Sequence, residues 1–118
     1  MKHTSVFLVG LMAVGKSSVG RQLADELGYS FYDSDHEVEI RAGAEIAWIF
    51  DVEGENGFRE RETQVINELT PIDRIVLATG GGVVLREENR RVLSNRGYVA
   101  YLTSPISLLA ERTRKDRR

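Results

Sequence analysis

Residues 10–17, which read GLMAVGKS, constrain the fold of this chain more than any other feature of its sequence. A continuous apolar run at residues 6–9 precedes them, as expected of a strand that is buried on both faces. After them, apolar residues recur at helical spacing between residues 19 and 27, and Gly28 is placed to end that helix. Two glycines, a lysine and a serine at this spacing, between a strand and a helix, are typical of a phosphate-binding loop.

The residue types in this loop suit a nucleotide polyphosphate. Gly10 and Gly15 permit backbone angles that a Cβ atom would forbid, so the loop can turn its N–H groups toward phosphate oxygens. Lys16 supplies a mobile positive charge for the β- and γ-phosphates, and Ser17 offers a hydroxyl to Mg²⁺. The helix that starts here points the positive end of its dipole at the same anion. A glycine-rich turn without a ligand is the alternative, and the flanking strand and helix argue against it.

Composition limits the other function classes. The 118 residues suffice for one compact domain but not for two. The net charge of -2 provides no global field to recruit nucleic acid or acidic lipid, and no apolar run approaches the roughly 18 residues of a membrane span. The absence of cysteine excludes disulfides and thiolate metal sites. We therefore expect a cytoplasmic protein that binds neither nucleic acid nor membranes. We also expect a monomer, an expectation that does not come from composition.

The rest of the chain alternates predicted strands with predicted helices. Apolar runs predict further strands at residues 29–32, 75–78 and 98–102. Helical patterns fall between them, and Ser34 with Glu37 predicts a capping box at the start of one helix. This alternation predicts an α/β fold with a parallel sheet and right-handed crossovers.

The last predicted helix opens at Ser104 and Pro105, as its N-cap and its first residue. No predicted strand follows it, and residues 112–118 hold five bases and one acid. Such a basic run is typical either of a solvated helix end, where cations suit the dipole, or of a segment that faces phosphate. Because a parallel α/β domain rarely ends in this way, we expect the sequence to be incomplete at its C-terminus.

Two carboxylates, Asp33 and Asp35, directly follow the second predicted strand. Ligands of open α/β sheets gather at the carboxyl ends of strands, and we expect this strand to lie beside the one that leads into the phosphate-binding loop. One carboxylate can then hold Mg²⁺ through water, while the other accepts a hydroxyl proton from an acceptor substrate. The alternative is that both only cap the helix that follows, where aspartate is favoured.

Arg59 and a triple glycine (Gly80, Gly81 and Gly82) are candidates for an acceptor site. Arg59 lies near the start of a predicted helix, where the dipole does not favour a cation, and its planar guanidinium suits a substrate carboxylate. The alternative partners of Arg59 are Glu55 or Glu62, at the surface. The triple glycine follows the third predicted strand and can expose its N–H groups to a small ligand. A flexible turn is the alternative there.

Taken together, these motifs resemble the shikimate kinase family. The resemblance is carried, in order, by the phosphate-binding loop and by residues 31–35 (FYDSD), 48–55 (WIFDVEGE), 57–59 (GFR) and 77–82 (LATGGG). It implies the P-loop, three-layer α/β fold of nucleoside monophosphate kinases, with residues 1–118 as one kinase domain and residues 33–62 as its substrate-binding subdomain. It also implies Mg²⁺-dependent transfer of the γ-phosphoryl group of ATP to the 3-hydroxyl of shikimate, in aromatic amino-acid biosynthesis.

The resemblance implies a role for each candidate residue. Those expected to contact ATP are Gly10, Ala13, Val14, Gly15, Lys16, Ser17 and Ser18 at its phosphates and Arg112 at its adenine. Those expected to bind shikimate are Asp35 at its hydroxyls, Arg59 at its carboxylate, and Gly80, Gly81 and Gly82, Gly81 above all, at a ring hydroxyl. Lys16 and Asp35 would act in catalysis, and Ser17 and Asp33 would hold Mg²⁺.

This sequence departs from the family's pattern in two places. Ala13 replaces a glycine that the family commonly has, which would store roughly 1–2 kcal/mol of strain if its φ were positive. We expect a negative φ there. The family also continues past Arg118 into a lid, a fifth strand and an adenine-side loop. Because lid closure excludes water and positions phosphate, we expect the 118-residue chain alone to bind nucleotide weakly and turn over little.

Other functions would also use a phosphate-binding loop. A related small-molecule kinase, similar to gluconate kinases, shares the phosphate-binding loop, although Arg59 and the triple glycine favour a compact carboxylated polyol. A GTPase switch would need an Asn-Lys-x-Asp segment, which the sequence does not contain. A nucleotide-binding remnant with little activity is the reading that the missing C-terminal segments would favour.

Overall fold

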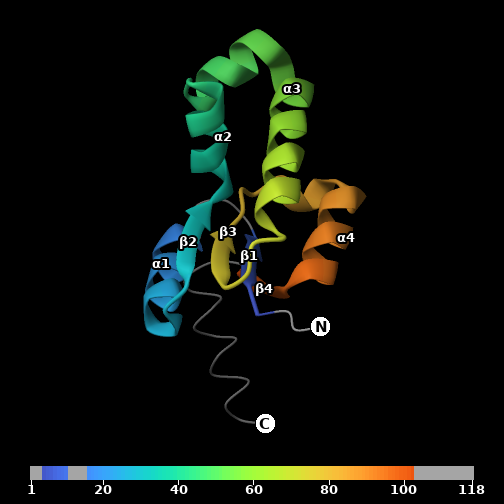
Figure 1. The fold of residues 1–118 in the computed structure, drawn as a ribbon. Coiled ribbons are helices and arrows are strands. Elements are labelled where there is room, and N and C mark those ends of the chain that lie inside the picture. Colours follow the sequence, from blue (N-terminus) through green and yellow to red (C-terminus); the bar gives the residue numbers. More distant parts are fainter. Residues whose placement is uncertain (1–3, 11–15, 103–118) are drawn as a thin grey trace.

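The computed structural model describes residues 4–10 and 16–102 (Figure 1). Its strands are β1 (Val6–Gly10), β2 (Ser30–Asp33), β3 (Ile75–Ala78) and β4 (Tyr98–Leu102). Its helices are α1 (Lys16–Leu27), α2 (Ser34–Ala42), α3 (Ile46–Leu69), the short 3₁₀ helix η1 (Val83–Leu85) and α4 (Glu87–Arg96). All strand pairs are parallel, so the predicted α/β fold with a parallel sheet is confirmed.

The strand order is β2-β3-β1-β4, which corrects one expectation. β2 does not lie beside β1, because β3 lies between them. The register pairs Ala78 of β3 with Leu8 of β1 on one side and with Asp33 of β2 on the other. Consecutive strands are neighbours only about two-thirds of the time, and here the chain runs through α2 and α3 before it returns to the sheet. The three carboxyl ends still meet at one edge.

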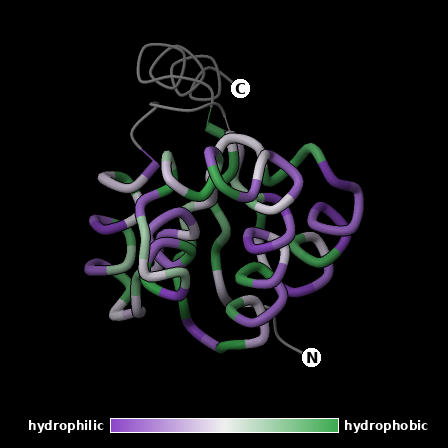
Figure 2. The backbone as a smooth tube through the Cα atoms, turned by 90° about the horizontal axis from the view of Figure 1, so that it is seen from above, coloured by the Kyte–Doolittle hydropathy of each residue, from purple (hydrophilic) through white to green (hydrophobic). Residues whose placement is uncertain are grey.

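Helices cover both faces of this sheet. α1 lies over one face, where Leu8 and Val76 pack with Ala24. α3 and α4 lie over the other, against Phe7 and Ile75. Figure 2 shows hydrophobic residues gathered along the strands at the centre and hydrophilic residues on the outer turns of the helices. β1 and β3 are buried in this way and need apolar residues on both sides, which explains their continuous hydrophobic runs.

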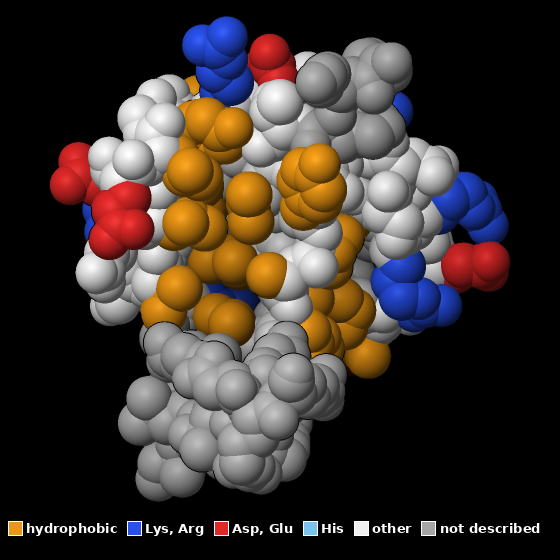
Figure 3. Space-filling view, turned by 90° about the horizontal axis from the view of Figure 1, so that it is seen from below, with side chains coloured by type: hydrophobic (Ala, Val, Ile, Leu, Met, Phe, Trp, Pro, Cys, Tyr) orange, Lys and Arg blue, Asp and Glu red, His pale blue; other side chains and the backbone are white. Residues whose placement is uncertain are grey.

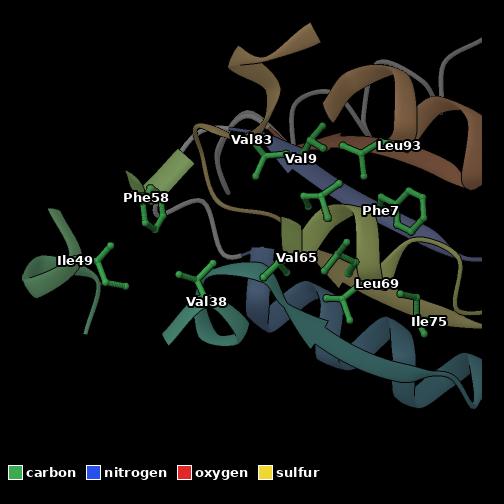
Figure 4. Packing of buried hydrophobic residues seen from close by; sticks show 12 residues of the cluster. Phe7, Val9, Val38, Ile49, Phe58, Val65, Leu69, Ile75, Val83 and Leu93 are labelled. Atoms are coloured by element: carbon green, nitrogen blue, oxygen red, sulfur yellow. The ribbon is translucent and has the colours of Figure 1, made fainter. Parts of the chain in front are cut away.

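α2 and α3 form an arm that rises above the carboxyl edge of the sheet (Figure 1). The main hydrophobic cluster continues into this arm through Val38 of α2 and through Ile49 and Phe58 of α3 (Figure 4). α3 is interrupted at Gly54, whose φ of 76° and ψ of 176° are not helical. A positive φ favours glycine, so this residue sets the bend between the two helical parts of α3.

The N-cap of α2 is Asp33, and the predicted capping box at Ser34 is therefore wrong by one residue. Oδ1 of Asp33 accepts hydrogen bonds from the backbone N–H groups of Asp35 (3.0 Å) and His36 (3.3 Å). Ser34 is the first helical residue, and its side chain is fully buried. This shift frees the serine hydroxyl for a different contact, at the triple glycine.

Within the described residues, β4 pairs only with β1 and is an edge strand. Tyr98 and Tyr101 of β4 are exposed, and the face seen from below carries a patch of hydrophobic side chains (Figure 3). The predicted helix that opens at Ser104 lies outside the described residues. None of the described helices combines the length and the apolar composition that crossing a membrane requires.

Candidate active site

Gly10 and Lys16 flank the part of the phosphate-binding loop that lies outside the described residues. The Lys16 side chain is buried, and its ammonium donates a hydrogen bond to the Gly10 carbonyl oxygen at 2.9 Å. Burial lowers the pKa of Lys16, and the negative charges of Asp35 and Asp33 oppose that effect. Gly10 has a φ of 144°, and a Cβ atom there would overlap the carbonyl group of Leu102 in β4. The sequence therefore needs glycine at this position for close packing as well as for phosphate.

The two oxygens of Asp33 have different partners. Oδ1 caps α2, and Oδ2 accepts a hydrogen bond from the Ser17 hydroxyl. Asp33 therefore caps the helix, which was the alternative for this residue, and it also contacts Ser17 of the phosphate-binding loop, while its role at Mg²⁺ stays a prediction. Hydroxyl and carboxylate oxygens are suitable ligands for Mg²⁺, so these two residues fit the proposed metal. In the described part of the chain no three acidic or histidine side chains cluster to hold a metal, so phosphates and water would supply the other ligands.

Asp35 follows Asp33 by two residues and lies against the triple glycine. A Cβ atom at Gly80 would lie 2.5 Å from Oδ1 of Asp35, so only glycine allows this approach. Burial raises the pKa of Asp35, and the charge of Asp33 raises it further, while Lys16 lowers it. A half-buried carboxylate with a raised pKa near a lysine is suited to accept a proton from a hydroxyl group.

Arg59 lies on α3 and faces the other end of the triple glycine. Its Nη1 donates to Oε1 of Glu62 at 3.0 Å, and its Nε lies 3.5 Å from Oε2 of Glu55 without a hydrogen bond. The guanidinium also lies over the Phe58 ring, 5.2 Å from its centroid. Glu62 is only 1% exposed, so this pair is not the surface contact that the sequence suggested. The buried pair fixes the guanidinium while leaving donors for an anion.

The triple glycine has hydrogen bonds and close contacts on both sides. The hydroxyl and N–H of Thr79 both donate to the Leu8 carbonyl, at 2.8 and 2.9 Å. The N–H of Gly80 donates to the Ser34 hydroxyl at 2.9 Å. A Cβ atom at Gly82 would overlap the Arg59 guanidinium. The segment therefore spans the gap between Asp35 and Arg59 and brings the two ends of the candidate acceptor site together.

The structure thus gathers most of the predicted site at one edge of the sheet. The predicted residues that it brings together are Lys16, Ser17, Asp33, Asp35, Arg59, Gly80 and Gly82. Gly81 lies half-buried between its neighbours, and Ser18 is exposed on α1. Ala13, Val14, Gly15 and Arg112 lie outside the described residues, so the sign of φ at Ala13 stays a prediction.

The sequence did not identify Ser34 and Thr79 as residues of the site, and it predicted Glu62 to lie at the surface. The signal for Ser34 was its place between two aspartates at a strand end, which was interpreted as a helix cap. Glu62 lies three residues after Arg59, a spacing that predicts contact on a helix but does not tell whether the pair is buried. Thr79 had no signal of its own beyond its position before the glycines.

Several known proteins have sequences similar to that of this chain. A family model described as "Shikimate kinase" matches residues 12–118. A shikimate kinase of Actinobacillus succinogenes is 60% identical over 114 residues, which are 97% of this chain and 65% of that protein. One of Chromohalobacter salexigens is 57% identical over 113 residues, which are 96% of this chain and 63% of that protein. The chain therefore spans somewhat less than two thirds of the length of these relatives.

Solved structures agree with the sequence matches. The shikimate kinase from Acinetobacter baumannii in complex with shikimate aligns with a TM-score of 0.85 and 53% identity, over 97% of this chain and 64% of that one. A gluconokinase from Sinorhizobium meliloti aligns with a TM-score of 0.50 and 22% identity, over 93% of this chain and 63% of that one. The second likeness shows a shared fold alone.

Proposed function

Because the chain belongs to the shikimate kinase family, we propose that it transfers the γ-phosphoryl group of ATP to the 3-hydroxyl of shikimate, giving shikimate 3-phosphate and ADP. The observation that carries this proposal is the triple glycine, which lies against a half-buried carboxylate, Asp35, at one end and a fixed guanidinium, Arg59, at the other. This arrangement suits a small acceptor with a hydroxyl and a carboxylate. The product belongs to aromatic amino-acid biosynthesis.

In the proposed reaction the acceptor is positioned for direct in-line transfer. Arg59 binds the acceptor carboxylate, and Asp35 orients the 3-hydroxyl and takes its proton. The new bond joins the 3-oxygen to the γ-phosphorus, and the bond from that phosphorus to the β,γ-bridging oxygen breaks, leaving ADP. Lys16 stabilises the charge that develops on the phosphates. Positioning of this kind can lower the barrier by several kcal/mol, roughly 7–11 at most.

Ser17 and Asp33 would hold Mg²⁺, which supplies charge neutralisation at the β- and γ-phosphate oxygens. In this proposal Arg112 stacks on the adenine of ATP, and its phosphates are lined by Gly10, Ala13, Val14, Gly15 and Ser18. The protein would be a cytoplasmic monomer, and residues 33–62 would form its substrate-binding subdomain.

The direct test is MgATP-dependent phosphoryl transfer to shikimate, quinate and gluconate, measured as ADP release. We expect release with shikimate, and release with gluconate instead would favour the gluconate-kinase-like alternative. Calorimetric titration with shikimate and a non-hydrolysable ATP analogue separates an active site from a remnant, since a remnant shows no mutual dependence of the two ligands. ADP release at a normal rate from the 118-residue chain would contradict the weak turnover that we expect of it.

Gly82→Ala is expected to weaken shikimate binding roughly 10- to 100-fold, because a methyl group would displace the Arg59 guanidinium. The φ of Gly82 is -91°, so alanine fits the backbone and only the lack of space opposes it. Titration calorimetry measures the affinity. Gly28→Ala is the matched control, because its φ of 72° makes alanine strained but nothing lies within 4 Å. That control should lower stability by about 1–2 kcal/mol and leave shikimate affinity intact.

The pH dependence of kcat should report the raised pKa of Asp35. The carboxylate must be ionised to accept a proton, so kcat should fall as the pH is lowered through the pKa of Asp35. Burial and Asp33 raise that pKa, so the midpoint should lie above the ordinary aspartate value of about 3.9. Circular dichroism at each pH separates this effect from unfolding. A midpoint at or below the ordinary value would contradict the assignment.

A further inference from the structure

Asn89, in the first turn of α4, is a buried polar residue that the proposed reaction does not use. It is 1% exposed, and its Nδ2 donates a hydrogen bond to the carbonyl oxygen of Val83 at 2.9 Å. Its Oδ1 is also buried and has no hydrogen-bond partner in the described part of the chain. A buried polar atom without a partner costs about 1–3 kcal/mol. An apolar side chain of the same size would avoid that cost, so the donated hydrogen bond needs another explanation.

Val83 directly follows the triple glycine. Its N–H donates to the Gly80 carbonyl at 3.1 Å, so it closes the turn that the glycines make. Its side chain is fully buried and packs in the main hydrophobic cluster beside Val9 and Leu93 (Figure 4). The hydrogen bond from Asn89 holds the other backbone polar group of Val83, its carbonyl.

The triple glycine is therefore fastened at both ends by side chains from outside it. The Ser34 hydroxyl holds the N–H of Gly80, and the Asn89 amide holds the carbonyl of Val83. Between these two attachments lie the close approaches to Asp35 and to Arg59. A displacement of about 1 Å at such a site can change affinity or rate by up to roughly 100-fold.

We propose that Asn89 is a positioning residue of the acceptor site, which holds the triple glycine against Asp35 and Arg59 through the Val83 carbonyl. The identity of the acceptor rests on the proposed function, whereas the fixing of the glycine segment does not. Asn89 itself would not touch substrate, because Val83 lies between it and the glycines.

The test compares Asn89→Leu, which removes the donor at similar volume, with Leu93→Ala. Leu93 is the matched control because it lies one turn further along α4, is equally buried, and belongs to the same cluster. We expect Asn89→Leu to weaken shikimate binding roughly 10-fold, with the affinity for a non-hydrolysable ATP analogue and the melting temperature unchanged. We expect Leu93→Ala to lower the melting temperature without changing the ratio of the two affinities. A parallel loss of both affinities in Asn89→Leu would overturn the proposal.

Amide hydrogen exchange in the ligand-free protein provides a second readout. In Asn89→Leu the N–H groups of Val83 and Leu85, which donate to Gly80 and Gly82, should exchange faster, while those of β1 and β3 stay protected. Unchanged exchange, or faster exchange with intact shikimate affinity, would overturn the proposal. If the unsubstituted protein binds no shikimate, the proposed function fails, and the exchange rates alone decide whether Asn89 fixes the glycines.

Discussion

Replacing Asp35 by asparagine is expected to lower kcat with shikimate by about 100- to 10,000-fold while leaving the affinity for nucleotide nearly unchanged. The amide has the size of the carboxylate, so it can still lie against Gly80, but it cannot take a proton from the acceptor hydroxyl. ADP release at saturating substrates measures kcat, and titration with a non-hydrolysable ATP analogue measures nucleotide affinity. Equal losses in both would contradict the role given to Asp35.

Asp33→Asn is the matched control for this prediction. It removes the same charge two residues away, and asparagine is as good an N-cap as aspartate, so α2 should stay intact. Asp33 accepts a hydrogen bond from the Ser17 hydroxyl, and these two residues are the proposed Mg²⁺ ligands. This variant should therefore weaken Mg²⁺-dependent nucleotide binding. A loss of kcat in Asp35→Asn and a loss of nucleotide affinity in Asp33→Asn would distinguish the proton acceptor from the metal ligand.

Replacing Arg59 by glutamine is expected to weaken shikimate binding by about 2 kcal/mol or more, roughly 30-fold, with little effect on nucleotide. Arg59→Lys should recover only part of the loss, because lysine keeps the charge without the planar fork. Arg61→Gln is the control, since Arg61 lies on the same helix and forms an ion pair with the exposed Glu53 at 2.7 Å. A shikimate affinity that is insensitive to Arg59→Gln would contradict its role as the carboxylate partner.

The Arg59→Gln substitution should also make the stability of the fold depend on pH, through the ionisation of Glu62. Burial raises the pKa of Glu62, and its hydrogen bond with Arg59 opposes that effect. Without Arg59 the folded-state pKa should rise further above the unfolded value of about 4.3. The folded state then binds more protons than the unfolded state, so stability is full below the unfolded pKa and is lost as pH rises through the folded pKa. Urea unfolding of Arg59→Gln between pH 4 and pH 8 would measure this loss.

Local sequence patterns predicted the parts of this fold that local forces determine. The strand at residues 98–102 and the strand at residues 75–78 have the predicted bounds, because each is an apolar run between turn residues. Asp33, Asp35, Arg59 and the triple glycine were recognisable because their residue types are unusual for the places where they stand. The resemblance to the shikimate kinase family then predicted that these separate motifs form one site.

Features that depend on contacts between distant segments could not be predicted in this way. β3 lies between β1 and β2, and no local pattern in the sequence predicts this strand order. The close approach of Arg59 to Gly82, which is far away in the sequence, is such a contact. Asn89 looks like an ordinary polar residue of a helix, and only the three-dimensional structure shows its amide against Val83.

The central place of β1 has a consequence for how the chain reaches its native state during synthesis. β1 is made first, but Val6 pairs with Val76 in β3 and with Tyr98 in β4, which are made much later. Its apolar side chains, Phe7 among them, therefore lack their partners while most of the polypeptide is still being translated. Such non-local pairing slows folding and leaves intermediates open to aggregation. We expect nascent chains that end before β4 to depend on chaperones that bind apolar strands.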